Sequence, residues 1–446
     1  MLRGVPDSQS RVTPLVAKSR GLFYGWYIIA VAMIGAFLCG GMTSQVFFSV
    51  ILKPLTTDLG WSRTEVTGAI TLGTLSAGLM APLAGSLADR FGPRYLAPAG
   101  ALIVALALIA LSRLQTLLVF YVAFIVARSV SSSTVTGVMS QTLAANWFRR
   151  MRGRAFGMLA MAVPLGGSVG ALAAQPIIDG PGWRTVFVVF PSLLLILFVV
   201  PSLIVYRRRP EDMGLLPDGD QRDAPGAPRQ RSRTPEISWT LREAVHTRAL
   251  WLLVTGMFIG TLANGAVSFH LVSYYTDKGI STALAASAIS LYAFCGAIAN
   301  FVWGFLVERM SERLLLAAAM ILSGASLVLM LPVQSAALAL VVAGLYGLAA
   351  RGEGTLVNTV LAQYYGRESY GRISGLVSPF NFVALGLGPL IASVSFDATG
   401  SYTTAFGLFS GTYIASAFLL WLARKPSRPD RPVLVTEHVE PATGAS

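Results

Sequence analysis

The sequence predicts an all-α membrane protein in which twelve transmembrane helices form two pseudo-symmetric bundles of six. Of the 446 residues, 54% are hydrophobic and only 12% are charged, whereas a soluble domain usually carries about 25% charged residues. Twelve long apolar runs and a pattern repeated in the two halves of the chain complete the prediction. The composition argues against a soluble enzyme, because such a chain would have almost no solvated surface.

Each apolar run can cross a bilayer as a helix, which needs about 20 mostly apolar residues and satisfies its own backbone hydrogen bonds. The expected spans are 23–50, 64–87, 95–112, 116–145, 155–178, 185–206, 248–275, 282–306, 313–331, 335–361, 373–395 and 402–423. The links are short except for one rich in Arg, Pro, Asp and Gly. The expected organisation is therefore a tail (1–22), a bundle (23–206), a linker (207–247), a second bundle (248–423) and a second tail (424–446).

The basic charge follows the expected membrane topology. The formal net charge is +13, from 34 Lys and Arg against 21 Asp and Glu. If both tails and the linker are cytoplasmic, 27 basic residues lie on inside segments, five lie on outside loops, and Arg128 and Arg351 lie within spans. An excess of Lys and Arg on the inside sets helix orientation in membranes. We therefore expect cytoplasmic termini, no nucleic-acid partner and, since 1–22 lacks the pattern, no removable signal peptide.

The sequence lacks the motifs of enzymes and of metal sites. Its two cysteines, Cys39 and Cys295, lie in apolar runs and form no CxxC pair. There is no HExxH motif and no Walker A motif. We therefore expect no catalytic activity, no cofactor and no bound metal.

The two halves repeat one pattern at a nearly constant offset. Residues 85–94 (GSLADRFGPR) recur 219 positions later as residues 304–313 (GFLVERMSER). Two further matches, 147–157 with 365–375 and 179–182 with 397–400, have an offset of 218. All three fall between corresponding spans of the two halves. Parallel six-helix repeats with a substrate site between them are typical of secondary transporters.

The stretch at 85–94 resembles the signature between the second and third spans of the major facilitator superfamily, and the resemblance extends over the whole chain. Gly85 would permit close helix approach, while Asp89 and the following arginines would make charged contacts that hold the two halves together. The resemblance implies a monomer in the plasma (inner) membrane. The expected gating residues are Gly85, Asp89, Arg90, Gly92 and Arg94, and in the second copy Gly304, Glu308, Arg309 and Arg313.

A narrower resemblance is to bacterial relatives of the monocarboxylate and oxalate/formate transporters. It rests on motifs such as YGW at 24–26, GWSRTE at 60–65, HLVSY at 270–274 and DATGSY at 397–402. This branch implies small organic anions, often moved with a proton. The chain departs from it in the eighth span, where many members have an arginine four residues before the motif glycine. Here that position is Asn300, so either another helix supplies the cation or the substrate is not a carboxylate.

Charged residues inside spans are candidates for the transport site, because a charge at the bilayer centre costs about 2.5–3.5 kcal/mol on insertion scales. They are Arg128 in the fourth span and Arg351 and Glu353 in the tenth. The resemblance places both spans along the central cavity, so an arginine would bind the carboxylate and Glu353 would carry the proton. Alternatively, the arginines bond a neighbouring helix or extend to the interface. Two positions apart, Arg351 and Glu353 cannot pair on a regular helix, although adjacent glycines would let it bend.

Uncharged polar residues inside spans form a second set of candidates. They can hydrogen-bond a substrate, but such side chains equally join helices within membranes. This set comprises Gln45, Asn264, His270, Asn300, Asn358 and Asn381.

Three functions remain open at this point. The favoured one is proton-coupled transport of a small organic anion by alternating access. The second is a carrier of a neutral or amphipathic metabolite, vitamin or drug, which the missing eighth-span arginine favours. The third is a transporter-shaped receptor, against which the intact motif of the first half counts. The repeat suits rocking bundles rather than the fixed pore of a channel.

Overall fold

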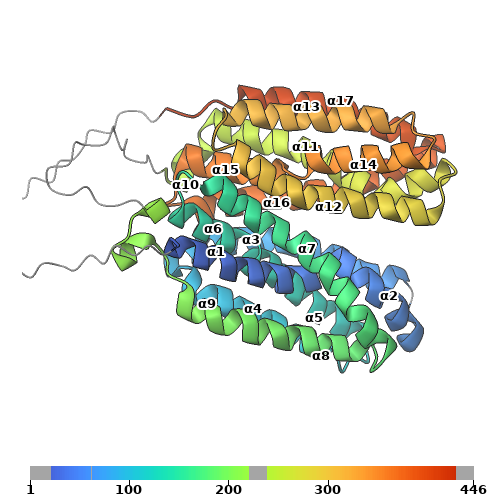
Figure 1. Ribbon diagram of the computed structural model, residues 1–446, viewed down its shortest axis with the longest axis horizontal. Helices are drawn as coiled ribbons and strands as arrows, with labels where there is room; N and C mark the ends of the chain where they lie inside the picture. Colours follow the sequence, from blue (N-terminus) through green and yellow to red (C-terminus); the bar gives the residue numbers. More distant parts are fainter. Residues whose placement is uncertain (1–21, 62, 220–238, 428–446) are drawn as a thin grey trace, which may run out of the picture.

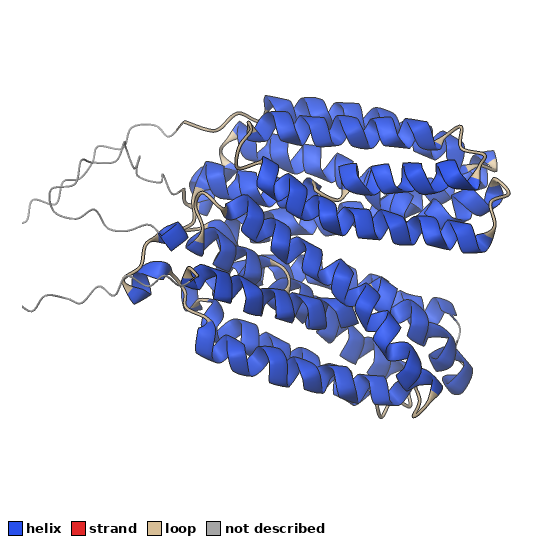
Figure 2. Ribbon diagram, viewed as in Figure 1, coloured by secondary structure: helices blue, strands red, loops and turns tan. Residues whose placement is uncertain are grey.

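The computed structural model describes residues 22–61, 63–219 and 239–427. Within these residues every regular element is a helix, as predicted (Figure 2). Eleven helices of this described part are long and apolar enough to cross a membrane, and a shorter apolar helix covers Tyr24–Gly40. The structure thus confirms the fold class of twelve spans.

The two halves of the chain form two helical bundles that lie side by side (Figure 1). The first bundle comprises α1 (Tyr24–Gly35), η1 (Ala36–Gly40), α2 (Gln45–Leu59), α3 (Arg63–Phe91), α4 (Pro93–Leu111), α5 (Leu117–Val130), η2 (Ser131–Val135), α6 (Val138–Trp147), α7 (Arg152–Asp179), α8 (Trp183–Leu194), η3 (Leu195–Val199) and α9 (Val200–Val205). The second comprises α11 (Arg248–Asp277), α12 (Thr282–Leu306), α13 (Glu312–Met330), α14 (Ala336–Ala350), α15 (Glu353–Tyr365), α16 (Tyr370–Thr399) and α17 (Tyr402–Leu422).

Short helices of the central linker lie at one end of both bundles, on the left in Figure 1. They are η4 (Pro210–Met213), η5 (Pro217–Gly219) and α10 (Leu241–Val245). We refer to this end of the molecule as the linker end. The carboxylate of Asp218 accepts hydrogen bonds there from the backbone amides of residues 149–151, which tie the linker to the loop between α6 and α7.

Two of the spans are interrupted helices. The first span extends to Leu59, beyond its predicted end at residue 50. Its second helix, α2, begins at Gln45 after a break, and the Ser44 hydroxyl caps this helix by accepting a hydrogen bond from the backbone amide of Phe47. In the tenth, α14 ends at Ala350 and α15 begins at Glu353. Gly352 lies at this break against the indole of Trp303, which occupies the space of a Cβ atom. The expectation that glycines beside Arg351 let this span bend is confirmed.

The bundles touch at two glycine crossings near the linker end. Where α3 crosses α16, a Cβ on Gly85 would lie 2.1 Å from the carbonyl oxygen of Gly371. Where α12 crosses α7, a Cβ on Gly304 would lie 2.1 Å from the carbonyl oxygen of Gly153. Only glycine allows backbones to approach this closely. The two crossings are equivalent under the sequence repeat, so the interface has the same pseudo-symmetry as the bundles.

At each crossing a buried carboxylate of one bundle hydrogen-bonds the other bundle. Asp89 on α3 accepts hydrogen bonds from the backbone amides of Gly371 (3.2 Å) and Arg372 (2.9 Å). Glu308, just after α12, accepts them from the backbone amide (2.8 Å) and Nε (2.7 Å) of Arg154. These amides belong to the first turns of α16 and α7, where backbone N–H groups lack helical partners and attract negative charge.

The arginines of the motif contribute differently from the expectation. The side chain of Arg372 is 4.0 Å from Asp89, so the amides rather than an arginine fork carry that contact. The guanidinium groups of Arg90, Arg94 and Arg309 lie over the aromatic rings of Phe91, Tyr95 and Phe305. Arg313 is partly buried on α13, and Gly92 has a positive φ of 76° that starts α4. The backbone amides make the main contacts with Asp89, because Gly371 has no side chain and lets the carboxylate reach the first turn of α16.

We expect Gly85→Ala to destabilise the conformation closed at the linker end, because the added methyl would meet a backbone carbonyl. A single reporter cysteine, Ser378→Cys in a background without Cys39 and Cys295, should then react faster with a membrane-impermeant thiol reagent applied from the linker side. Gly411→Ala adds the same methyl where no atom lies within 4 Å. Equal labelling of these two variants would contradict the role of the crossing.

Asp89→Asn and Glu308→Gln should each increase labelling of the same reporter, and the double variant more than either. The reason is that hydrogen bonds to a charged group contribute about 1.5–3 kcal/mol each. The matched control is Asp397→Asn, an exposed carboxylate far from the crossings. Unchanged labelling at normal expression would show that the carboxylates do not hold the bundles together.

Candidate functional site

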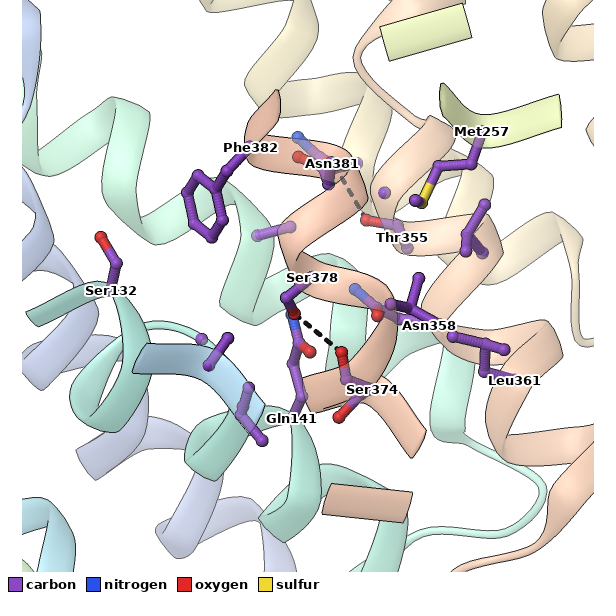
Figure 3. A pocket seen from close by; sticks show the side chains of 18 residues that line it. Ser132, Gln141, Met257, Thr355, Asn358, Leu361, Ser374, Ser378, Asn381 and Phe382 are labelled. Carbon is purple, nitrogen blue, oxygen red and sulfur yellow. Dashed lines mark hydrogen bonds between the residues drawn. The ribbon is translucent and has the colours of Figure 1, made fainter. Parts of the chain in front are cut away.

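A cavity of about 270 Å³ lies between the two bundles (Figure 3). Its walls come from α3, η2, α6 and α7 on one side and from α11, α12, α15 and α16 on the other. The polar residues that line it are Ser132, Gln141, Asn300, Thr355, Asn358, Ser374, Ser378 and Asn381. No Asp, Glu, Lys or Arg is among the described residues of its wall. The cavity therefore offers hydrogen bonds but no charge.

Helix α16 supplies most of the polar wall. Ser374, Ser378 and Asn381 are spaced by four and three residues, which places them on one face of the helix. Phe382 adds an aromatic surface beside them (Figure 3). Gln141 from α6 belongs to the opposite bundle, so a solute in the cavity would touch both bundles at once.

The amides of the second bundle differ in how well they are already paired. Asn300 donates to the carbonyl of Gly296 (2.9 Å) and accepts from the hydroxyl of Thr355 (2.9 Å). Asn358 accepts from the hydroxyl of Tyr370 at 3.3 Å. Asn381 makes a single long contact of 3.4 Å to Thr261. Asn358 and Asn381 thus keep more hydrogen-bonding capacity for a solute than Asn300, and the contact of Asn381 is the longest of the four.

Three of the amides expected from the sequence, Asn300, Asn358 and Asn381, line the cavity. The sequence analysis missed the remaining polar wall, which comprises Ser132, Gln141, Thr355, Ser374 and Ser378. Serine and threonine are common in membrane helices, so their type alone carries little information. The single-face spacing of 374, 378 and 381 was the signal that could have found part of this set.

Arg128 lies away from the cavity and joins two spans. Its Nη1 atom donates to the carbonyl of Thr43 (3.1 Å) at the break between η1 and α2. Its alkyl chain packs on Gly73 of α3. The sequence analysis gave such a bond to a neighbouring helix as the alternative to substrate binding by an arginine within a span.

Arg351 and Asn264 belong to a polar cluster inside the second bundle. The Arg351 guanidinium lies 5.4 Å from the centre of the Tyr292 ring, and the Tyr292 hydroxyl donates to Asn264 Oδ1 at 2.6 Å. Neither residue is among those that line the cavity.

His270 is buried between α11, α16 and α17. Its Nε2 atom is 3.0 Å from the carbonyl oxygen of Pro389 and 3.3 Å from the hydroxyl of Ser393, and its ring packs on Tyr402. It does not line the cavity. Gln45 lies in the first turn of α2, and its side chain is outside what the structure describes.

Glu353 is buried next to the cavity wall rather than in it. Its side chain, on a residue that is only 4% exposed, lies against Gly260 of α11 and near Met320 of α13. Its Oε1 atom has no hydrogen-bond partner within the described part of the chain. It forms no ion pair with Arg351 or with any other residue described. Thr261, the residue after Gly260, accepts a hydrogen bond of 3.4 Å from Asn381.

Comparison with known proteins agrees with this architecture. The profile of the Major Facilitator Superfamily matches residues 31–294 and 273–444. Monocarboxylate transporter 4 of Mus musculus is 24% identical over 442 residues, which cover 94% of this chain and 87% of that protein. An MFS-type transporter of Gibberella moniliformis is 24% identical over 411 residues, which cover 90% of each chain.

Solved transporter structures share the fold. The human organic anion transporter MFSD10 superposes with a TM-score of 0.68 at 16% identity, over 89% of this chain and 99% of that one. The transporter FucP in its outward conformation superposes with a TM-score of 0.67 at 13% identity, over 90% and 100% of the two chains. Since the family profile covers nearly all of the described spans, the chain belongs to the major facilitator superfamily and is a membrane transporter of the monocarboxylate transporter type.

Proposed function

We propose that the protein moves a small organic anion of the monocarboxylate class across the plasma membrane together with a proton, by alternating access. The observation that carries this proposal is a buried carboxyl, Glu353, whose neighbour in the chain, Gly354, lines a cavity shared by two bundles. In the proposed cycle the bundles rock about this cavity, and the glycine crossings close the linker end. The distribution of Lys and Arg supports a cytoplasmic linker end.

The surroundings of Glu353 favour a proton as the coupling ion. A metal cation needs several protein ligands, and the described residues contain no group of three or more His, Cys, Asp or Glu side chains that could hold one. A buried carboxylate without a cation partner is costly in a membrane protein, and taking up a proton removes that charge.

An uncharged cavity is compatible with a carboxylate that travels with a proton. The pair has no net charge, and amide and hydroxyl groups can donate hydrogen bonds to the carboxylate oxygens. The relatives named monocarboxylate transporters support this substrate class.

A neutral solute is the second candidate, and the absence of charged side chains from the described wall favours it. Uptake into proteoliposomes separates the two. Radiolabelled monocarboxylates and their uncharged amides would be compared with and without an inward proton gradient. Gradient-dependent uptake of the acids alone supports the first candidate, and gradient-independent uptake of the amides supports the second.

Glu353→Gln should abolish accumulation driven by a proton gradient while substrate exchange continues. Glutamine resembles the protonated carboxyl but cannot release a proton. Counterflow and gradient-driven uptake would be measured in the same vesicles, with Glu368→Gln on the exposed loop before α16 as the control. If the Glu353 variant still accumulates substrate, the proton site lies elsewhere.

Asn381→Ala should raise the half-saturation concentration of the substrate roughly tenfold or more, as expected for losing a hydrogen bond worth about 1.5–3 kcal/mol to a charged group. Asn264→Ala removes the same amide outside the cavity and should leave that concentration unchanged, with rates normalised to the amount of inserted protein. Equal values in wild type and Asn381→Ala would exclude this wall as the binding site.

A further inference from the structure

We infer that Arg152 closes the cavity toward the linker end, because its guanidinium joins the ends of two helices that line the cavity from opposite bundles. This inference rests on the alternating access of the proposed function, but not on its solute or its proton. It adds a buried cation to the two carboxylates at the glycine crossings. It also names a bond that must break before a solute can leave on the linker side.

The guanidinium of Arg152 bridges the two bundles. Arg152 is the first residue of α7 and is only 2% exposed. Its Nη1 atom donates to the carbonyl oxygen of Ala362 at 2.9 Å, in the last turn of α15 in the second bundle. Its Nε and Nη2 atoms donate to the carbonyl oxygen of Ala145 at 3.3 and 3.1 Å, in the last turn of α6 in its own bundle. One side chain therefore holds two helix ends together.

An arginine suits this position because of what a helix end offers. The last carbonyls of a helix lack partners within it, and together they carry a partial negative charge. Ala145 and Ala362 are fully buried, so their carbonyls need donors from the protein. The amide of Gly366 also bonds the Ala362 oxygen, at 3.1 Å, and a carbonyl has a second lone pair for Nη1. The planar guanidinium, with its donors in a fixed fork, serves both helix ends at once.

These bonds lie between the cavity and the linker end. Gln141 of α6 and Asn358 of α15 line the cavity, and each lies four residues before a carbonyl that Arg152 binds. Four residues are about one helical turn, or roughly 5–6 Å along the helix axis. Both helices end near the linker helices (Figure 1), and the amide of Trp239 bonds the carbonyl of Tyr365, the last residue of α15. While the bridge persists, a solute held by the two amides cannot leave between the ends of α6 and α15.

A second arginine makes the reciprocal contact. Arg367, in the loop between α15 and α16, donates from Nη1 to the carbonyl oxygen of Asn146 at 3.1 Å, in the last turn of α6. Its Nη2 atom pairs with Glu211 of the linker helix η4. Each bundle thus sends an arginine to a helix end of the other. The sequence repeat does not show this exchange, because the offset of 218 places Tyr370 at the position equivalent to Arg152.

Rocking of the bundles separates these contacts unequally. Movement of α15 away from α6 must break the bond of Arg152 to Ala362, because that bond joins the two bundles. The bond of Arg367 to Asn146 breaks for the same reason. The bonds of Arg152 to Ala145 lie within the first bundle and can remain. Hydrogen bonds with a charged partner are roughly twice as strong as neutral ones, so the bridge favours the conformation closed at the linker end.

The test compares how fast one cysteine reacts from the two sides of the membrane. The reporter is Ser378→Cys in the cavity wall, in the background without Cys39 and Cys295, and a membrane-impermeant thiol reagent is added on either side. Arg152→Met removes the charge and the donors at a similar side-chain length. It should raise the ratio of linker-side to opposite-side labelling roughly tenfold or more, as expected for losing hydrogen bonds to a charged group. A loss of folding would instead raise labelling from both sides.

Arg152→Lys retains the charge but not the planar fork, so it should raise the ratio by a smaller factor. If the Met variant does not insert into the membrane, the Lys variant decides the test, and an unchanged ratio in it overturns the inference. The matched control is Arg242→Met, since Arg242 is an exposed arginine of α10 at the same end of the molecule. This control should keep the wild-type ratio.

Gly85→Ala, which we expect to open the same end, is the reference variant. A wild-type ratio in Arg152→Met at normal expression overturns the inference, and so does an equal rise of labelling from both sides. If Gly85→Ala raises the ratio and Arg152→Met does not, only the bridge is wrong. If neither variant changes the ratio, the proposed alternating access between the two bundles fails as well.

Discussion

The structure depends on two buried carboxylates that cap helices of the opposite bundle. Asp89 and Glu308 accept hydrogen bonds from the first turns of α16 and α7. Free amides at a buried helix end need partners, and a carboxylate is the partner that the helix dipole favours. The glycine crossings bring the carboxylates within reach. Together they fix one end of the bundle interface, and the cavity lies between the same two bundles.

The wall of the cavity comes from both of the bundles that this pseudo-symmetric contact holds together. Its polar wall is built mainly by α15 and α16, while Gln141 and Ser132 reach it from the other bundle. The charged residues of the spans are held elsewhere: Arg128 on a helix break and Arg351 on an aromatic ring. The described part of the wall therefore has no charged side chain, and the buried carboxyl of Glu353 is next in the chain to Gly354, which lines the cavity.

The tenth span is interrupted beside its two charged residues, Arg351 and Glu353. The break lies at Arg351 and Gly352, so Glu353 is the first residue of α15, and the two charged side chains form no ion pair in the described structure. Here Trp303 packs against the break and donates its indole N–H to the carbonyl of Leu348 (2.7 Å). The tenth span thus combines a rigid anchor with a carboxyl that faces α11.

The sequence by itself determined the spans, the two-fold repeat, the carboxylates Asp89 and Glu308 and the close-packing glycines. These are local properties, because apolar length, residue size and repeated spacing are written in consecutive residues. Only the tertiary structure decided which polar side chains share a cavity. Arg128 faces a carbonyl, Asn264 faces a tyrosine and Asn381 faces a threonine of α11. The role of a polar residue in a membrane helix depends on which helix packs against it, and that partner lies far away in the sequence.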